Sequence, residues 1–111
     1  MDDRARRLGL NEALFREVNE RIERVSESLQ TTSEQLAILC ECGDESCTER
    51  VDVSIADYER IRADPTLFFV QPGHEAPDVE DVVERGPGWD VVRKRTGGPA
   101  ELATELDPRS D

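Results

Sequence analysis

All three cysteines of the chain lie in the stretch LCECGDESCTER, residues 39–50, and the chain has one histidine, His74. Cys40 and Cys42 are two residues apart, so on a strand their side chains leave the same face. Gly43 allows a tight turn that would bring Cys47 back to them. Three neighbouring thiolates repel one another unless a cation neutralises them, and zinc takes sulfur and imidazole ligands in a tetrahedron. The spacing therefore predicts a Cys3His zinc site: Cys40, Cys42, Cys47 and His74.

Two other interpretations of these residues stay open. In the first, Cys40 is a small buried apolar residue, Cys42 and Cys47 have no joint role, and His74 closes a loop. In the second, the thiols form a redox-active cluster without metal. A zinc ion with four protein ligands has no open position for substrate, so the predicted site is structural. Such a site contributes about 10–16 kcal/mol of apparent binding energy to folding.

The sequence does not indicate an enzyme. Nucleophilic mechanisms of the Ser-His-Asp or Cys-His type need a free histidine as base, and the zinc site uses His74. The glycines of GPG and TGG lack the strand-to-helix context of a phosphate-binding loop. We therefore expect a small zinc-stabilised protein-interaction or regulatory module. The alternative function is a cytosolic thiol and zinc redox sensor that changes partner binding on oxidation.

Length and charge limit the fold and the partners. The 111 residues are 36% apolar and 36% charged, which predicts one domain with a small hydrophobic core. A core of this size needs further stabilisation by a staple, which can be a metal, a disulfide or a partner subunit. The net charge is −12, and residues 36–111 hold eighteen acidic against eight basic residues. This charge repels phosphate backbones, so we expect no nucleic acid. We expect a protein partner, and the charge would suit a basic one or serve solubility alone. We expect no membrane contact and a cytoplasmic location, because no apolar run or secretory signal stands out.

The fold class that we predict is α+β, with an N-terminal amphipathic helix on a small, mostly antiparallel sheet. The helix is indicated by apolar residues three or four apart, which are Leu10, Leu14, Val18, Ile22, Val25 and Leu29. We expect this stripe to pack on the sheet of the same domain. A homodimer through a short seam of the same helix is the alternative, since the stripe also fits two heptads.

The remaining elements follow from alternation and from turn residues. We expect strands at 36–42, 50–55 and 66–70, with a zinc-stapled hairpin between the first two. A short middle helix should begin after Ser54, whose hydroxyl can cap it, and end near Asp64, because Pro65 follows. The sequence VVERGPGWDVVRKR predicts a hairpin around GPG, although residues 79–85 could instead form a helix. Its basic end, residues 93–95, should lie at a sheet edge and offset nearby acids.

The domain boundaries that we predict are a flexible N-terminus at 1–9, a single zinc-stabilised domain at 10–95 and a disordered acidic tail at 96–111. The tail is rich in glycine, proline and acidic residues, although PAELATEL could form one or two transient helical turns.

A resemblance rests on three motifs across residues 14–95: FREVNERI, CEC followed by a third cysteine, and PGH. With Tyr58 and Arg62 between them, these motifs resemble a family of small uncharacterised proteins of high-GC Gram-positive bacteria. The resemblance implies a stand-alone module and no particular activity.

Overall fold

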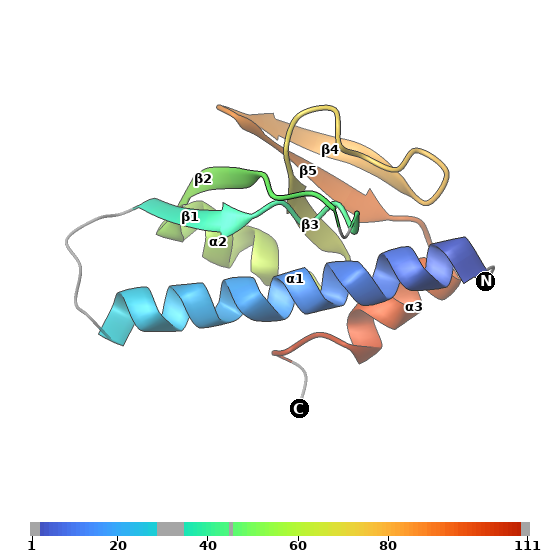
Figure 1. The fold of residues 1–111 in the computed structure, drawn as a ribbon, viewed down its shortest axis with the longest axis horizontal. Coiled ribbons are helices and arrows are strands. Elements are labelled where there is room, and N and C mark those ends of the chain that lie inside the picture. Colours follow the sequence, from blue (N-terminus) through green and yellow to red (C-terminus); the bar gives the residue numbers. More distant parts are fainter. Residues whose placement is uncertain (1–2, 29–34, 45, 110–111) are drawn as a thin grey trace.

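The computed structural model describes residues 3–28, 35–44 and 46–109. It confirms the α+β class and shows antiparallel strands throughout. The elements in chain order are α1 (Asp3–Ser28), β1 (Gln35–Leu39), β2 (Arg50–Ser54), α2 (Ile55–Arg62), β3 (Leu67–Val70), β4 (Glu80–Gly86), β5 (Trp89–Lys94) and α3 (Gly98–Glu105) (Figure 1). Among the described residues, no helix has the length and apolar character needed to cross a membrane.

The strands form two sheets instead of the single sheet that we expected. β1 and β2 form a two-stranded sheet, and the other strands form a three-stranded sheet in the order β3-β5-β4. The hairpin interpretation of residues 79–95 is confirmed, since β4 pairs antiparallel with β5. Gly88 takes a φ of 85° in the turn, a conformation that glycine adopts at no steric cost. β5 is thus the central strand, and its basic end does not lie at a sheet edge.

A shared apolar core holds the two sheets together. It contains alternate residues of β1 and β2, two residues of α2, and Phe69, Trp89 and Val91 from the three-stranded sheet. Phe69 lies at its centre, stacked on Tyr58 with ring centroids 6.1 Å apart and edge-on to Trp89 at 5.4 Å. Helix α2 covers this core as the sequence predicted: the hydroxyl of Ser54 accepts a bond from the Asp57 amide and caps its first turn.

Helix α1 lies on the sheets in the opposite orientation to the one expected. Its buried side is polar, while Leu10, Leu14 and Val25 are 41%, 56% and 55% exposed. The expectation that the apolar stripe packs inward is therefore wrong for these residues, and Leu29 lies outside the described residues. The inward-facing residues of this helix are Glu12, Arg16, Asn19, Glu20 and Glu23.

Each inward polar group of α1 meets a partner from a distant part of the chain. The Arg16 guanidinium lies 3.5 Å from the centre of the Phe68 ring and donates to the carbonyl of Pro65 at 2.6 Å. Glu20 accepts a bond from the Tyr58 hydroxyl at 2.8 Å and pairs with Arg62 at 3.2 Å. These partners offset the cost of burying charge, which explains how a polar face can pack against the domain.

The basic end of β5 contributes to the same layer. The Lys94 ammonium lies between two buried carboxylates, 2.5 Å from Glu12 and 3.2 Å from Glu80. We call these three residues the ion-pair cluster. Arg93 and Arg95 instead pair with Asp64 and Asp81 at the exposed surface, as expected of a solvated face.

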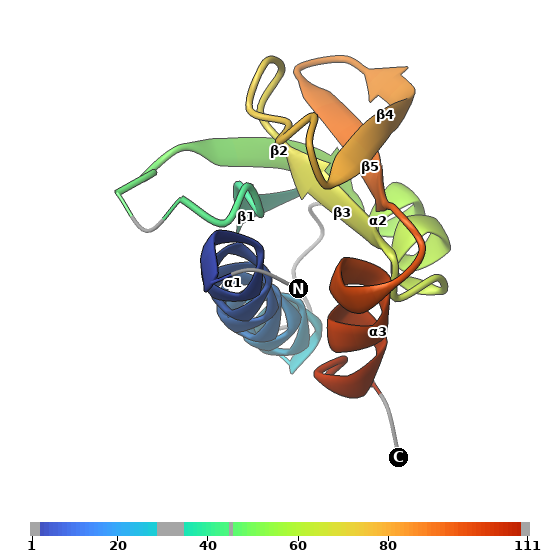
Figure 2. The same cartoon turned by 90° about the vertical axis from the view of Figure 1, so that its right-hand side faces the viewer.

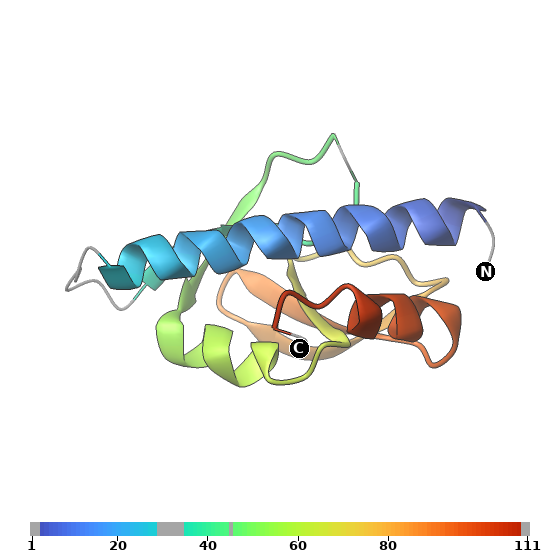
Figure 3. The same cartoon turned by 90° about the horizontal axis from the view of Figure 1, so that it is seen from below.

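Both end segments of the chain contain more helix than we predicted. Residues 3–9 belong to α1, and residues 98–105 form helix α3, whose Leu102 and Ala103 are buried. In Figure 2, α3 lies beside α1 below the sheets, and Figure 3 shows the two helices from that side. The two helices approach so closely that a side chain at Gly9 would meet Leu102 at 2.6 Å. Helical structure therefore replaces the flexible N-terminus predicted at 1–9 over residues 3–9, and the disordered tail predicted at 96–111 over residues 98–105.

Candidate metal centre

Cys40 and Cys42 lie just after the end of β1. At this point the β1–β2 pairing ends and the chain forms hydrogen bonds with β3. The Glu41 amide donates to the carbonyl of Phe69 at 2.8 Å, and the Glu41 carboxylate accepts from the Phe69 amide at 2.9 Å. This bidentate contact fixes the residue between the two cysteines. Both thiols therefore lie at the junction of the two sheets, among apolar side chains of β3 and β5.

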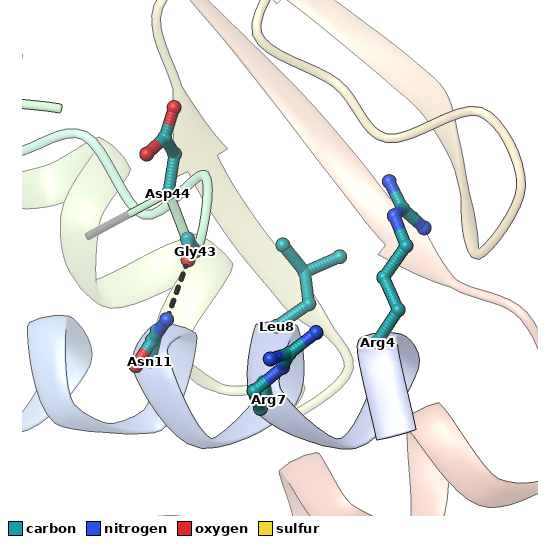
Figure 4. Close-up of a pocket in the computed structure, with 6 residues that line it drawn as sticks. All are labelled: Arg4, Arg7, Leu8, Asn11, Gly43 and Asp44. Carbon is teal, nitrogen blue, oxygen red and sulfur yellow. Dashed lines mark hydrogen bonds between the residues drawn. The ribbon is translucent and has the colours of Figure 1, made fainter. Parts of the chain in front are cut away.

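Gly43 turns the chain immediately after Cys42 and lies against α1. Its φ is 81°, and an added side chain would come within 2.6 Å of Leu8 and 2.9 Å of Glu12. The Asn11 amide donates to the Gly43 carbonyl at 2.9 Å, as Figure 4 shows. Glycine is thus required twice here, for the positive φ and for the close approach to the helix. The contact explains how α1 holds the cysteine loop in place.

The other two candidate ligands are presented by tight turns. In the first, the Cys47 amide donates to the Asp44 carbonyl at 2.9 Å, and the Asp44 carboxylate accepts from the Ser46 amide. In the loop after β3, the His74 amide donates to the Gln71 carbonyl at 2.9 Å, with Gly73 at a φ of 88°. Two loops distant in the sequence are therefore folded toward one point.

The structure brings together the four residues that the sequence singled out. The ligand atoms of Cys40, Cys42, Cys47 and His74 all lie within 4.8 Å of one another, so the group could hold a metal ion. Nδ1 of His74 is 3.6 Å from Sγ of Cys40 and 3.7 Å from Sγ of Cys47. A tetrahedral ion about 2.3 Å from sulfur and about 2.0 Å from nitrogen separates such ligands by about 3.6 Å. The distances from His74 to Cys40 and to Cys47 therefore fit a tetrahedral shell.

The three thiols have unequal acidity because they share hydrogen bonds. A bond from Cys40 lowers the pKa of Cys42 to about 5, so Cys42 is a thiolate at neutral pH. The same bond and burial raise the pKa of Cys40, and burial raises that of Cys47. The Gln71 amide donates to Sγ of Cys40 at 3.2 Å and favours its ionised form. An incoming cation would thus find one thiolate ready and displace protons from the other two thiols.

The site is buried on one side and open on the other. Cys40 and Cys42 are buried against Phe68 and Val70, while Cys47 is partly exposed and His74 is exposed. The apolar side excludes water from two sulfur atoms. The open side gives an ion a short path to the ligands, without a channel through the protein.

The described acids near the cysteines do not share one environment. Glu41 is fully buried, and the Asn19 amide donates to its carboxylate at 3.0 Å. Asp44 serves its own turn, and Glu49 is exposed. Glu45 lies outside the described residues. Glu41 therefore has a structural role as an acceptor, whereas Glu49 remains part of the solvated surface.

Several residues that support the site were not found from the sequence. Asn11 holds Gly43, Asn19 holds Glu41, and the Gln71 amide contacts Cys40. One signal was present, because Asn19 falls within the FREVNERI motif on the flank of the apolar stripe. The amide of Gln71 leaves no trace in residue type, since any residue except proline supplies it.

Together, the elements and the four ligands define an α+β protein with a candidate four-ligand metal site between two antiparallel sheets. Comparison of the chain with known protein families, curated proteins and solved structures finds no match in any of the three. The chemistry of the site itself therefore carries the functional argument.

Proposed function

We propose that the protein is a small zinc-stabilised module that acts through protein contacts and not through catalysis. The observation that carries this proposal is the convergence of Cys40, Cys42, Cys47 and His74, whose ligand atoms lie within 4.8 Å of one another. Four protein ligands fill a tetrahedral shell and leave no position for a substrate. The ion then has a structural role.

The ligand types support zinc among the divalent cations. Calcium and magnesium prefer oxygen ligands, whereas three thiolates and an imidazole are soft or borderline donors. Tetrahedral sites of sulfur and nitrogen ligands are characteristic of zinc, which also has no redox chemistry of its own. The complete centre would carry a charge of about −1, since three thiolates exceed the charge of the ion by one.

The position of the site supports a role in joining the two sheets. Cys40, Cys42 and Cys47 belong to the connection between β1 and β2, and His74 belongs to the loop after β3. Zinc would therefore fix the β1–β2 hairpin on the three-stranded sheet. A rigid surface of this kind suits recognition, because fewer groups need to be ordered when a partner binds.

A second candidate function is a redox sensor, and the exposure of Cys47 favours it. Oxidants reach accessible thiols first, and oxidation of one zinc ligand weakens the site. In a sensor, two cysteines would each give up one electron to peroxide and form a disulfide, which releases zinc and produces water. Mild peroxide should then release zinc and remove two free thiols per chain, whereas a purely structural site should keep both.

The proposal is tested by elemental analysis of the purified protein and of two variants. We expect one zinc ion per chain, a weakened or lost ion in His74→Ala, and no change in Glu49→Gln. Glu49 is a matched control because it is an exposed acidic residue of the same loop and not one of the four ligands. A folded wild-type protein without metal would overturn the proposal and return the thiols to redox or catalytic interpretations.

A further inference from the structure

The outward side of α1 carries an apolar strip that no described element covers. We define the outer face of α1 by six residues three or four positions apart: Arg7, Leu10, Leu14, Val18, Arg21 and Val25. Three of the five large apolar residues that are exposed among the described residues lie on it. In Figure 2, the sheets lie above α1 and α3 lies at its side. Leu10 and Leu14 are 41% and 56% exposed. An isolated exposed leucine is normal, but an aligned strip indicates an interaction surface.

The inverted orientation of α1 also gives this face a charge opposite to that of the whole chain. Three acids of the helix, Glu12, Glu20 and Glu23, are turned inward and buried. Among residues 3–25, the exposed charged residues are five arginines and two acids, Asp3 and Glu17. Arg4 pairs with Asp78, and Arg21 pairs with Glu17 at 3.0 Å, so the net positive charge comes mainly from the other three arginines. The chain as a whole has a net charge of −12. Two of these arginines, Arg7 and Arg21, belong to the outer face, and the others lie elsewhere on the exposed side of α1. The exposed side of α1 therefore combines an apolar strip with a net positive charge, on an acidic protein.

We propose that the outer face of α1 binds a helical segment of a partner protein whose apolar seam is flanked by aspartate or glutamate. Spacings of three and four residues are those with which two helices interlock along a seam. The face extends over about 27 Å from Arg7 to Val25, long enough for about five turns of a partner helix. Acidic flanks would complement the arginines and disfavour basic partners.

The charge of this face argues against two other occupants. A second copy of the chain would bring the same arginine-rich faces together, which like-charge repulsion disfavours. An anionic membrane would attract the arginines, but Arg7 and Arg21 lie within the apolar strip and not only along its borders. Helices that lie on membranes keep their cations on the polar face, and a protein of charge −12 is repelled by anionic lipid.

The test uses zinc-loaded full-length protein and two labelled peptides of four heptads. Both peptides carry leucine at the a and d positions, one with glutamate and the other with lysine at the e and g positions. Fluorescence anisotropy should show that the glutamate peptide binds at least about tenfold more tightly than the lysine peptide. Leu14→Glu should weaken this binding at least about tenfold, whereas Val83→Glu should not change it. Val83 is the matched control because it is 50% exposed on β4, away from α1.

A charge-reversal variant distinguishes specific pairing of charges from non-specific hydrophobic binding. The double variant Arg7→Glu and Arg21→Glu should lose the glutamate peptide and gain the lysine peptide. Equal binding of both peptides by the wild-type protein, or binding that Leu14→Glu leaves intact, would overturn the proposal. So would a dimer that Leu14→Glu dissociates, or binding to phosphatidylserine vesicles that the same variant abolishes, since each identifies a different occupant.

The proposal rests on the proposed function only in assuming that the module acts by binding protein. Metal content is measured on the same samples. One zinc ion per chain without peptide binding would overturn the docking surface and leave the metal proposal standing. Specific peptide binding by a folded, metal-free protein would do the reverse.

Discussion

The candidate metal centre and the ion-pair cluster each bring distant parts of the chain together, but with different chemical groups. In the first, three thiols and an imidazole surround one point at the junction of the sheets. In the second, Lys94 joins Glu12 of α1 to Glu80 of β4 inside the protein. Gly43 is in contact with both regions. It follows the candidate ligand Cys42 in the chain, and a side chain at Gly43 would come within 2.9 Å of Glu12. A chain with only 36% apolar residues thus fastens its helix, its hairpin and its larger sheet through polar groups.

The two regions differ in what their removal should cost. A structural zinc site gains its ligand-binding energy only in the folded state, so its metal contributes directly to folding. A buried ion pair gives little net stability over an apolar replacement, but breaking it leaves an uncompensated charge. Losing the metal should therefore affect the whole fold, whereas losing the lysine should weaken the fold and spare the metal.

The largest effect should follow removal of the metal. Structural zinc sites supply about 10–16 kcal/mol of apparent binding energy, as much as or more than the net stability of a domain, about 5–15 kcal/mol. We expect protein stripped with a chelator to lose its cooperative thermal transition and to recover it when zinc is returned. Circular dichroism follows the transition in both states. Superimposable melting curves with and without zinc would show that the metal is not a staple.

The second effect should come from Lys94→Met, which leaves two buried carboxylates without their cation. Breaking a buried charge pair costs about 3–5 kcal/mol in unfolding free energy. Zinc content should stay at one ion per chain, because none of the three residues of the cluster is a metal ligand. Urea unfolding measures the difference.

Arg95→Met is the matched control for this variant. Arg95 is the next residue along and pairs with Asp81 at the exposed surface. Exposed pairs contribute little to stability, so this variant should resemble the wild type. If both variants lost the same stability, burial of the ion-pair cluster would not be the cause.

The third effect should come from Gly43→Ala, which affects both regions at once. Positive φ costs an L-residue about 1–2 kcal/mol, and overpacking against Leu8 and Glu12 adds about 1–3 kcal/mol. Gly88→Ala is the control, since Gly88 has a φ of 85° with nothing within 4 Å of an added side chain. We expect a larger loss of stability, and weaker zinc binding in a competition assay, only for Gly43→Ala. Equal losses would mean that the close approach to α1 is unimportant.

A fourth effect should be a pH dependence that neither region causes. Burial, followed by a hydrogen bond shared with Glu59, raises the pKa of Glu23 from 4.5 to about 8. A carboxyl whose pKa is raised by folding stabilises the protein fully below its ordinary pKa, and this stability is lost as the pH rises through about 8. Glu23→Gln stays neutral, so its stability relative to wild type should increase between pH 5 and pH 8.5. Urea titrations at several pH values measure this difference, and a constant difference would contradict it.

The sequence allowed the four candidate metal ligands to be predicted but not the ion-pair cluster, and residue frequency explains the contrast. Three cysteines in eight residues and a single histidine leave few ways to combine them. Acidic and basic residues make up 36% of the chain, so no pattern indicates that Glu12 meets Lys94. Their contact depends on how α1 lies against β5, which is a tertiary property.

Local signals fixed some elements well and failed for others. Ser54 and Pro65 allowed both ends of α2 to be predicted, because helix capping and proline geometry act within a few residues. The apolar period of α1 gave the helix but not its inward side, since partners such as Phe68 and Tyr58 make a polar face able to pack. Helix α3 was expected only as transient turns within a tail, because its few apolar residues gain stability only from contact with α1 and β5.

The central claim is that one zinc ion is bound by three thiolates and one imidazole. X-ray absorption spectroscopy of the purified protein at the zinc edge tests it most directly. The account predicts three sulfur atoms at about 2.3 Å and one nitrogen at about 2.0 Å from the metal. A shell that contains oxygen in place of these ligands, or a folded protein with no zinc signal, would contradict it.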